Sequence, residues 1–133
     1  MGLRFEFDAE NKILLVVFDG RLTDESLTEG YQEIRKYSTA SDARAGIVDF
    51  SSVTEFAASS GLVRELARLD PALPDASHRP RCIVAPVTHI FGIARMFQIV
   101  GESKRPSLKV VRTIDEAFAV LGVHDSHFEP FSL

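Results

Sequence analysis

Hydrophobic and polar residues alternate along this 133-residue chain in periods that are typical of strands and helices. Residues 3–7 alternate with a period of two, which predicts a half-buried strand. The run 13–18 is apolar at every position, which predicts a central strand covered on both faces. The polar segment 9–12 between them predicts a turn, so the chain is expected to open with a β-hairpin.

Four amphipathic helices and three further strands are predicted after the hairpin. The helices run from the cap Thr23 to about Tyr37, from Ser59 or Ser60 to Leu69, from the cap Thr88 to a left-handed Gly101, and from the capping box at Thr113 to Gly122. The strands cover residues 46–50, 81–85 and 108–111, with an irregular stretch at 54–57 and a surface loop at 71–80.

Alternation of strands and helices after one hairpin predicts the fold class. We expect a single α/β domain whose five-stranded, mostly parallel sheet carries four helices and an N-terminal β-hairpin. The domain is expected to span residues 1–122, with a C-terminal tail at 123–133. Sites in such sheets favour the carboxyl ends of the strands, which here are residues 49–52, next to the helix start at Ser59, and residues 85–89.

Composition narrows the class of partner. Hydrophobic residues make up 45% and charged residues 26% of the chain, which excludes disorder and coiled coil. The net charge is −4, so the chain lacks the basic excess that is typical of nucleic-acid-binding proteins. The short basic runs 78–81 and 104–105 are predicted to be solvated loop charges. The single Cys82, expected to be a buried and inert residue, cannot form an internal disulfide, which favours a cytoplasmic location. The longest apolar stretch, 90–100, is too short to span a membrane, so no stable membrane insertion is expected.

Two segments carry a resemblance to a known family. Residues 47–51, followed by residues 58–62, resemble the strand–loop–helix centre of STAS domains, in which an Asp-Ser-Ser/Thr-Gly-Leu motif opens a helix. Residues 84–97 are similar to the divergent SpoIIAA-like group, also called STAS/SEC14-like. The resemblance implies a SpoIIAA-like fold in a bacterial, cytoplasmic protein-interaction or regulatory module. It also implies that Ser59 matches the serine that is phosphorylated in the antagonists of this family.

The motif departs from the family pattern at two positions, because Ala58 replaces the Asp and Val63 replaces a small Gly. From the residues alone, Ser59 and Ser60 are candidates for a phospho-acceptor or anion site at a helix N-terminus, and simple N-capping is the alternative. Asp49 is predicted to accept N–H bonds from Ser51 or Ser52 in an Asx turn.

Catalysis and cofactor binding are not expected. The chain has no Gly-rich phosphate loop, paired His and carboxylate, or nucleophile elbow, and an enzyme would need Asp49, Ser59 or His89 to converge in one pocket. His124 and His127 have an i, i+3 spacing, but they lie in the predicted tail, where nothing fixes a ligand geometry. We therefore expect neither a metal nor a cofactor.

The helix predicted at about 89–100 is apolar on both sides. Phe91 and Ile99, interleaved with Arg95, lie outside the arc that faces the sheet. Either loops or the tail residues Phe128 and Phe131 cover them, or they form a dimer face or the wall of an apolar groove. The candidate partner or ligand surface comprises Thr88, His89, Phe91, Arg95 and Ile99.

Two functions follow from these features. The first is a non-catalytic regulatory module that binds a protein partner and forms a homodimer through this helix. The second, which the STAS/SEC14-like resemblance implies, is a small carrier of an apolar or lipid-like ligand. The sequence identifies neither the partner nor the ligand nor the pathway.

Overall fold

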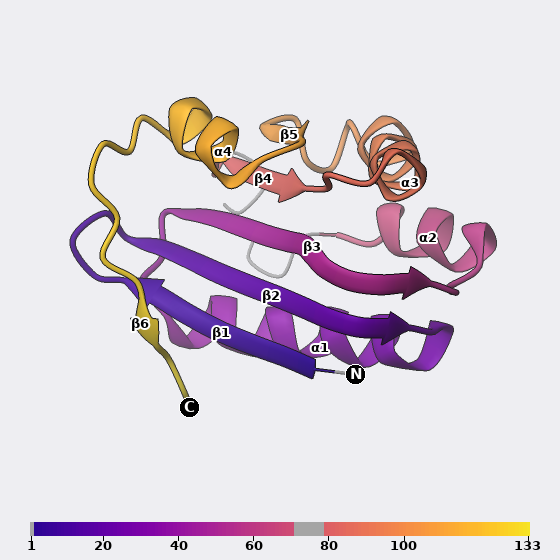
Figure 1. The fold of residues 1–133 in the computed structure, drawn as a ribbon, viewed down its shortest axis with the longest axis horizontal. Coiled ribbons are helices and arrows are strands. Elements are labelled where there is room, and N and C mark those ends of the chain that lie inside the picture. Colours follow the sequence, from indigo (N-terminus) through magenta and orange to yellow (C-terminus); the bar gives the residue numbers. More distant parts are fainter. Residues whose placement is uncertain (1, 71–78) are drawn as a thin grey trace.

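The computed structural model describes residues 2–70 and 79–133, which form one mixed six-stranded sheet with helices on both faces (Figure 1). The sheet order is β5-β4-β3-β2-β1-β6. Strands β2 to β5 are parallel, whereas β1 pairs antiparallel with both β2 and β6. The strands are β1 Gly2–Asp8, β2 Ile13–Leu22, β3 Ala45–Phe56, β4 Arg81–Val84, β5 Leu108–Val111 and β6 Glu129–Pro130. The predicted single α/β domain with its N-terminal hairpin is confirmed.

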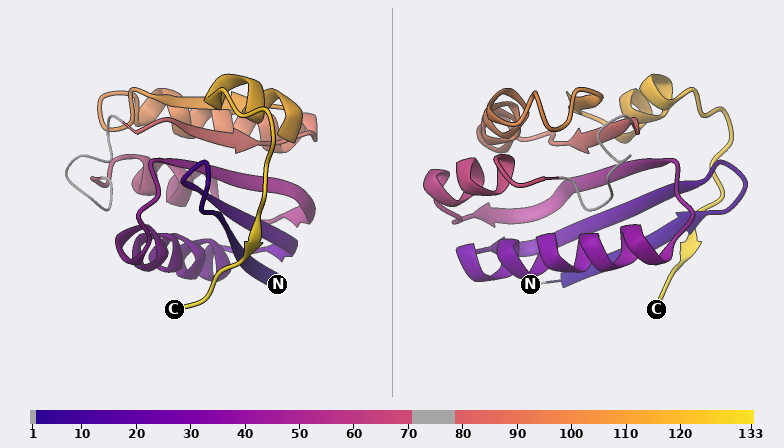
Figure 2. Two further views of the ribbon diagram at one scale, coloured as in Figure 1. Left: turned by 90° about the vertical axis from the view of Figure 1, so that its left-hand side faces the viewer. Right: turned by 180° about the vertical axis from the view of Figure 1, so that it is seen from behind.

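The helices divide unequally between the two faces of the sheet (Figure 2). They are α1 Asp24–Ala40, α2 Ser60–Ala67, α3 Thr88–Val100 and α4 Ile114–Leu121. Helices α1, α2 and α3 pack on one face, which we call the three-helix face. Helix α4 and the side chain of Phe128 cover part of the other, which we call the α4 face.

Three strands differ from the sequence prediction. The sixth strand, β6, comes from the predicted tail and pairs with β1 at the edge of the sheet. Strands β2 and β3 continue beyond their predicted ends, and β3 absorbs most of the stretch expected to be irregular. Register shifts between Val17 and Asp19 and between Gly20 and Arg21 keep the two strands paired, and Gly20 adopts a φ of 74° there. The alternation of apolar and polar residues cannot predict how far these two strands extend, because each register shift interrupts that alternation.

The helix ends also bring corrections. Thr88 is the first residue of α3 rather than its cap, which is Val87 and makes no side-chain hydrogen bond. Gly101 is not left-handed, since its φ is −98°; a Cβ there would lie only 2.7 Å from the carbonyl oxygen of Ala67, so close contact with α2 explains the glycine. Leu69 lies beyond α2 and is 40% exposed.

The remaining caps follow the sequence prediction. Thr23 accepts a hydrogen bond from the Ser26 backbone, and Thr113 accepts one from the Glu116 backbone. The capping box predicted at Thr113 is only half formed, because the Glu116 carboxylate accepts a hydrogen bond from the Thr113 hydroxyl and not from its backbone N–H. Gly122, where the last helix was predicted to end, has a left-handed φ of 71°. Most of the predicted surface loop, residues 71–78, lies outside the described residues.

Candidate functional site

The N-terminus of α2 presents Ser59 and Ser60 at the carboxyl end of β3. The Ala57 backbone N–H donates to the carbonyl of Leu22 over 2.7 Å, which ties this connection to the end of β2. Ser59 then adopts an extended backbone, and its hydroxyl accepts a hydrogen bond from the Leu62 N–H at 3.2 Å. Ser59 is therefore the N-cap, and both serines are exposed.

A carboxylate from a different element contacts the cap serine. The Ser59 N–H donates to one Asp24 carboxylate oxygen at 2.6 Å, and the Ser59 hydroxyl donates to the other at 3.2 Å. Asp24 is the first residue of α1, so these bonds join the starts of two helices. A carboxylate therefore contacts this serine although position 58 is an alanine, and it comes from 34 positions earlier in the chain, as 58 − 24 = 34. No local motif could have predicted this pairing.

Asp49, Ser59 and His89 do not form a catalytic group. Asp49 accepts hydrogen bonds from the Ser51 N–H at 2.8 Å and from the Ser51 hydroxyl at 2.5 Å, which confirms the predicted local role. Among the described residues, no hydrogen bond connects these three side chains. The three residues also come from different elements: Asp49 from β3, Ser59 from the position before α2 and His89 from the first turn of α3.

The outer side of α3 is only partly covered. The Arg112 guanidinium lies 4.1 Å from the centre of the Phe91 ring, whereas Ile99 is 60% exposed. Thr88, His89 and Arg95 are exposed too. The tail aromatics that could have covered this surface pack elsewhere: Phe128 stacks on Phe118, and Phe131 packs on Phe7 and Tyr37.

One residue of the histidine pair in the C-terminal segment, His127, contacts residues of the β1–β2 hairpin. The His127 backbone N–H donates to the Asp8 carboxylate at 3.0 Å, and its ring lies 3.6 Å from the carboxylate of Glu10. Within residues 2–70 and 79–133, no three His, Cys, Asp or Glu side chains are grouped to hold a metal ion. Cys82 is buried, and that burial raises the pKa of its thiol to about 11, as expected for an unreactive cysteine.

A cavity of about 210 Å³ lies between the sheet and the helices of the three-helix face. Its walls are mostly apolar side chains from β2, β3, α1, α2 and α3. Four arginines complete the lining, and none of the described lining residues is Asp or Glu. We call it the arginine cavity, after Arg35, Arg79, Arg81 and Arg105.

The arginines gather at the amino end of the parallel strands. Arg81 is the first residue of β4, Arg79 precedes it by two residues, and Arg105 lies three residues before β5. Among the described residues, the Arg81 guanidinium has no hydrogen-bond or ion-pair partner. Burial, with smaller contributions from Arg105 and Arg79, lowers the pKa of Arg81 to about 10.

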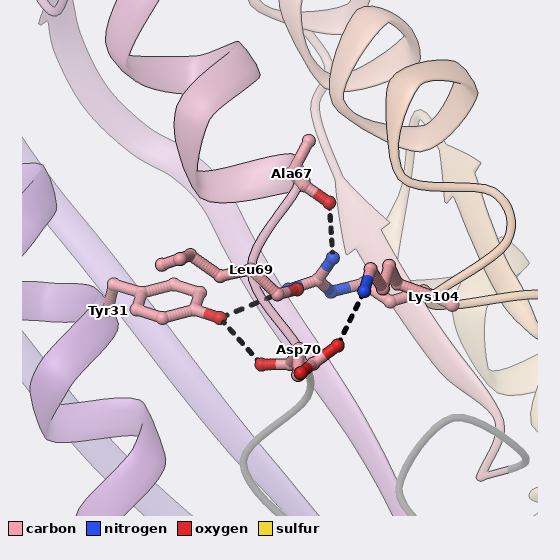
Figure 3. A network of polar contacts seen from close by, with 6 residues as sticks. Tyr31, Ala67, Leu69, Asp70 and Lys104 are labelled. Carbon is pink, nitrogen blue, oxygen red and sulfur yellow. Dashed lines mark hydrogen bonds and ion pairs between the residues drawn. The ribbon is translucent and has the colours of Figure 1, made fainter.

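Arg105 has a mainly structural role at this end of the cavity, where Tyr31, Ala67, Leu69 and Asp70 lie close together (Figure 3). It is only 7% exposed and donates to the carbonyls of Ala67 and Leu69 at 3.0 and 3.2 Å, which satisfies the end of α2. It also donates to the hydroxyl of Tyr31 on α1 at 3.1 Å, and that hydroxyl donates to the Asp70 carbonyl at 3.4 Å. Arg105 therefore connects α1, α2 and the segment before β5.

Three of these arginines are less exposed than the sequence predicts. Arg79, Arg81 and Arg105 were expected to be solvated loop charges, but Arg105 is buried and the other two are half-buried. His78 of the same run lies outside the described residues. The available signal was the alternation along β4, because Arg81 shares a face with the core residue Ile83.

Comparisons with known proteins bear on the fold. No protein-family model matches the chain, and no curated protein matches it in sequence. A solved structure of the anti-sigma factor antagonist SpoIIAA in its unphosphorylated form matches with a TM-score of 0.60 at 17% identity, covering 93% of this chain and 100% of that one. The chain has the SpoIIAA-like STAS fold.

The SpoIIAA-like fold is matched a second time. A structure of the Bacillus cell fate determinant SpoIIAA in the phosphorylated form has a TM-score of 0.54 at 18% identity, covering 89% of this chain and 97% of that one.

No helix among the described residues is long and apolar enough to cross a membrane.

Proposed function

We propose that this SpoIIAA-like chain is a non-catalytic regulatory module of a bacterial cytoplasm, and that it binds a protein partner around Ser59 and Ser60. The observation that carries the proposal is the exposed cap serine, held by Asp24 at the start of α2. The structural likeness supports it, because SpoIIAA is an anti-sigma factor antagonist whose structure exists in unphosphorylated and phosphorylated forms.

Phosphorylation of Ser59 would act through two opposing contacts. The N-terminus of α2 favours a phosphate, because its backbone N–H groups and dipole attract negative charge. The Asp24 carboxylate, 3.2 Å from the Ser59 hydroxyl, repels it. The phosphate therefore breaks the contact between α1 and α2 while leaving each helix intact, and this changes the surface that a partner contacts.

Site-specific crosslinking tests the partner surface. A photo-crosslinking amino acid replaces Ser60 in one variant and the exposed Gln32 on α1 in a control. We expect one cell protein to crosslink at position 60 and not at position 32, and the crosslink to disappear when Ser59→Glu is added. Equal crosslinking at both positions, or a crosslink unaffected by Ser59→Glu, contradicts the proposed surface.

We also propose that the chain forms a homodimer through the outer side of α3, with Phe91, Arg95 and Ile99 facing a second copy. The exposed Ile99 supports this, whereas Arg112 already shields part of Phe91. Sedimentation at tens of micromolar should show a dimer for the wild type and a monomer for Phe91→Glu and Ile99→Glu. A monomeric wild type or dimeric variants would exclude this interface.

The arginine cavity favours a second candidate function, the binding of a small apolar or lipid-like ligand. Native mass spectrometry of freshly purified protein tests it. Retained adducts of hundreds of daltons support a carrier, and a clean polypeptide mass from cells rich in lipids argues against one.

A further inference from the structure

We propose that the arginine cavity binds a single-chain amphiphile with an anionic head group, a carboxylate or a phosphate. This ligand class rests on the second candidate function above and goes beyond it by specifying the head group and the residues that bind it. The apolar tail lies between the sheet and the helices, and the head group lies against Arg81 and Arg79.

Charge is the first support for this ligand. The whole chain has a net charge of −4, yet its cavity is lined by four arginines and, among the described lining residues, by no carboxylate. A half-buried guanidinium without an anion loses hydration and gains nothing in return. The lowered pKa of Arg81 reflects this cost, which a bound carboxylate or phosphate relieves.

The four arginines differ in exposure and in what they have left to donate, and Arg35 is exposed on α1, where water hydrates its guanidinium. Arg105 uses its guanidinium on the carbonyls of Ala67 and Leu69 and on the Tyr31 hydroxyl. Arg79 donates one N–H group to a backbone carbonyl at 2.8 Å and keeps others. The Arg81 guanidinium has no such partner among the described residues, so Arg81 is the main residue that binds the head group.

The apolar interior continues directly from these arginines. Gly46 lies opposite Arg81 in the parallel β3–β4 pair and lines the cavity without a side chain. Beyond it, Val48 and Phe50 of the same face belong to or pack against the core cluster. A volume of about 210 Å³ is below the roughly 300–1,000 Å³ of typical ligand pockets, which favours a short or medium acyl chain over a whole phospholipid.

Isothermal titration calorimetry of lipid-stripped full-length protein tests this assignment with three probes of equal tail length: decanoate, decyl phosphate and decanol. The variant Arg81→Gln removes the guanidinium that binds the head group. Arg68→Gln is the matched control, because Arg68 is exposed and outside the cavity lining. Gly46→Leu fills the cavity from the sheet, with Ala94→Leu as a second filling variant should the first fail to fold.

We expect at least one anionic probe to bind about tenfold or more tightly than decanol, and Arg81→Gln to weaken it by roughly tenfold to a hundredfold, as for a lost hydrogen bond to a charged group. Arg68→Gln should leave the affinity unchanged, and the filling variants should weaken all probes. The tighter anion identifies the head group as carboxylate or phosphate.

Two results overturn the assignment in distinguishable ways. If decanol binds as tightly as both anions, or Arg81→Gln has no effect, the anionic head group is wrong and an apolar ligand remains. If no probe binds at millimolar concentration, or binding survives both filling variants, the cavity is not a ligand site and the second candidate function fails with it.

Discussion

The two faces of the sheet are packed in different ways. The α4 face has one eight-residue helix, which packs with Phe128 on a core cluster that includes Val17, Ile47 and Val84. The three-helix face has three helices and still contains the arginine cavity. Three covering helices have therefore not filled the space above this face.

Side-chain size and a polar connection explain this difference. On the α4 face, the fully buried Ala117 and Cys82 let the helix approach the strands closely. On the three-helix face, Arg105 connects Tyr31 of α1 to the end of α2, while its own guanidinium occupies the space between them. The helices on that face are held in place without filling the volume beneath them, which is the arrangement that a ligand pocket requires.

The largest expected effect concerns the C-terminal segment beside the α4 face. Asp8 is 0% exposed, and its carboxylate accepts hydrogen bonds from both the backbone and side chain of Asn11 and from the backbones of Glu10 and His127. Asp8→Ala leaves these donors without their acceptor and should cost about 3 kcal/mol in urea unfolding. Asp125→Ala, on an exposed side chain nearby, should stay within about 0.5 kcal/mol.

If both variants cost the same small amount, the Asp8 contacts do not hold the C-terminal segment. The α4 face would then be closed by α4 and its apolar contacts alone.

A matched pair of alanine substitutions tests the comparison of the faces directly. Ala117→Leu adds volume to the closed α4 face and should cost about 2 kcal/mol in thermal or urea unfolding. Ala94→Leu adds the same volume to α3, where Ala94 lines the arginine cavity, and should change stability by less than about 1 kcal/mol in either direction. Equal costs at the two sites would show that the three-helix face is as tightly packed as the other.

Glycine substitutions distinguish the two long helices of the three-helix face. Alanine normally stabilises a helix by about 1 kcal/mol relative to glycine. A Cβ at Gly30 in α1, however, would lie 2.4 Å from the Phe18 ring, which is buried and stacked on Phe50. Gly30→Ala should therefore cost about 1 kcal/mol net.

The control lies on α3, where a Cβ at Gly92 meets nothing within 4 Å. Gly92→Ala should raise stability by roughly 0.5–1 kcal/mol in the same assay. A stabilising Gly30→Ala would mean that Phe18 moves into the arginine cavity at little cost, so α1 would not be tightly packed against Phe18.

The sequence predicts most of the fold because each of its signals is local. The all-apolar run 13–18 identified the central strand, and Thr23 and Thr113 identified helix starts. Strand β6 was not predicted, because it is two residues long, includes Pro130 and is defined by its pairing with β1.

The candidate sites were predictable to different degrees. Ser59 was found because its cap and its helix are adjacent in the sequence. Its Asp24 partner and the arginine cavity were missed, because each depends on residues from separate elements. The arginines of the cavity also lie at the amino end of the parallel strands, whereas sites in such sheets favour the carboxyl ends.

The smallest expected effect is the acid dependence of the Asp8 contacts, which sharpens the first prediction. Burial opposes ionisation of Asp8, but its hydrogen bonds from Asn11, His127 and Glu10 outweigh burial and lower its pKa below the ordinary 3.8. A carboxyl whose pKa is lower in the folded state contributes stability above the unfolded pKa, and this contribution is lost as the pH falls through the folded pKa. The stability difference between wild type and Asp8→Asn, measured by urea unfolding, should therefore be constant from pH 7 to 5 and should narrow below about pH 4. A difference that stays constant down to pH 2.5 would show that the Asp8 pKa is not lowered by folding. The C-terminal segment would then be held beside the α4 face by Phe128 and the β6 pairing rather than by charge.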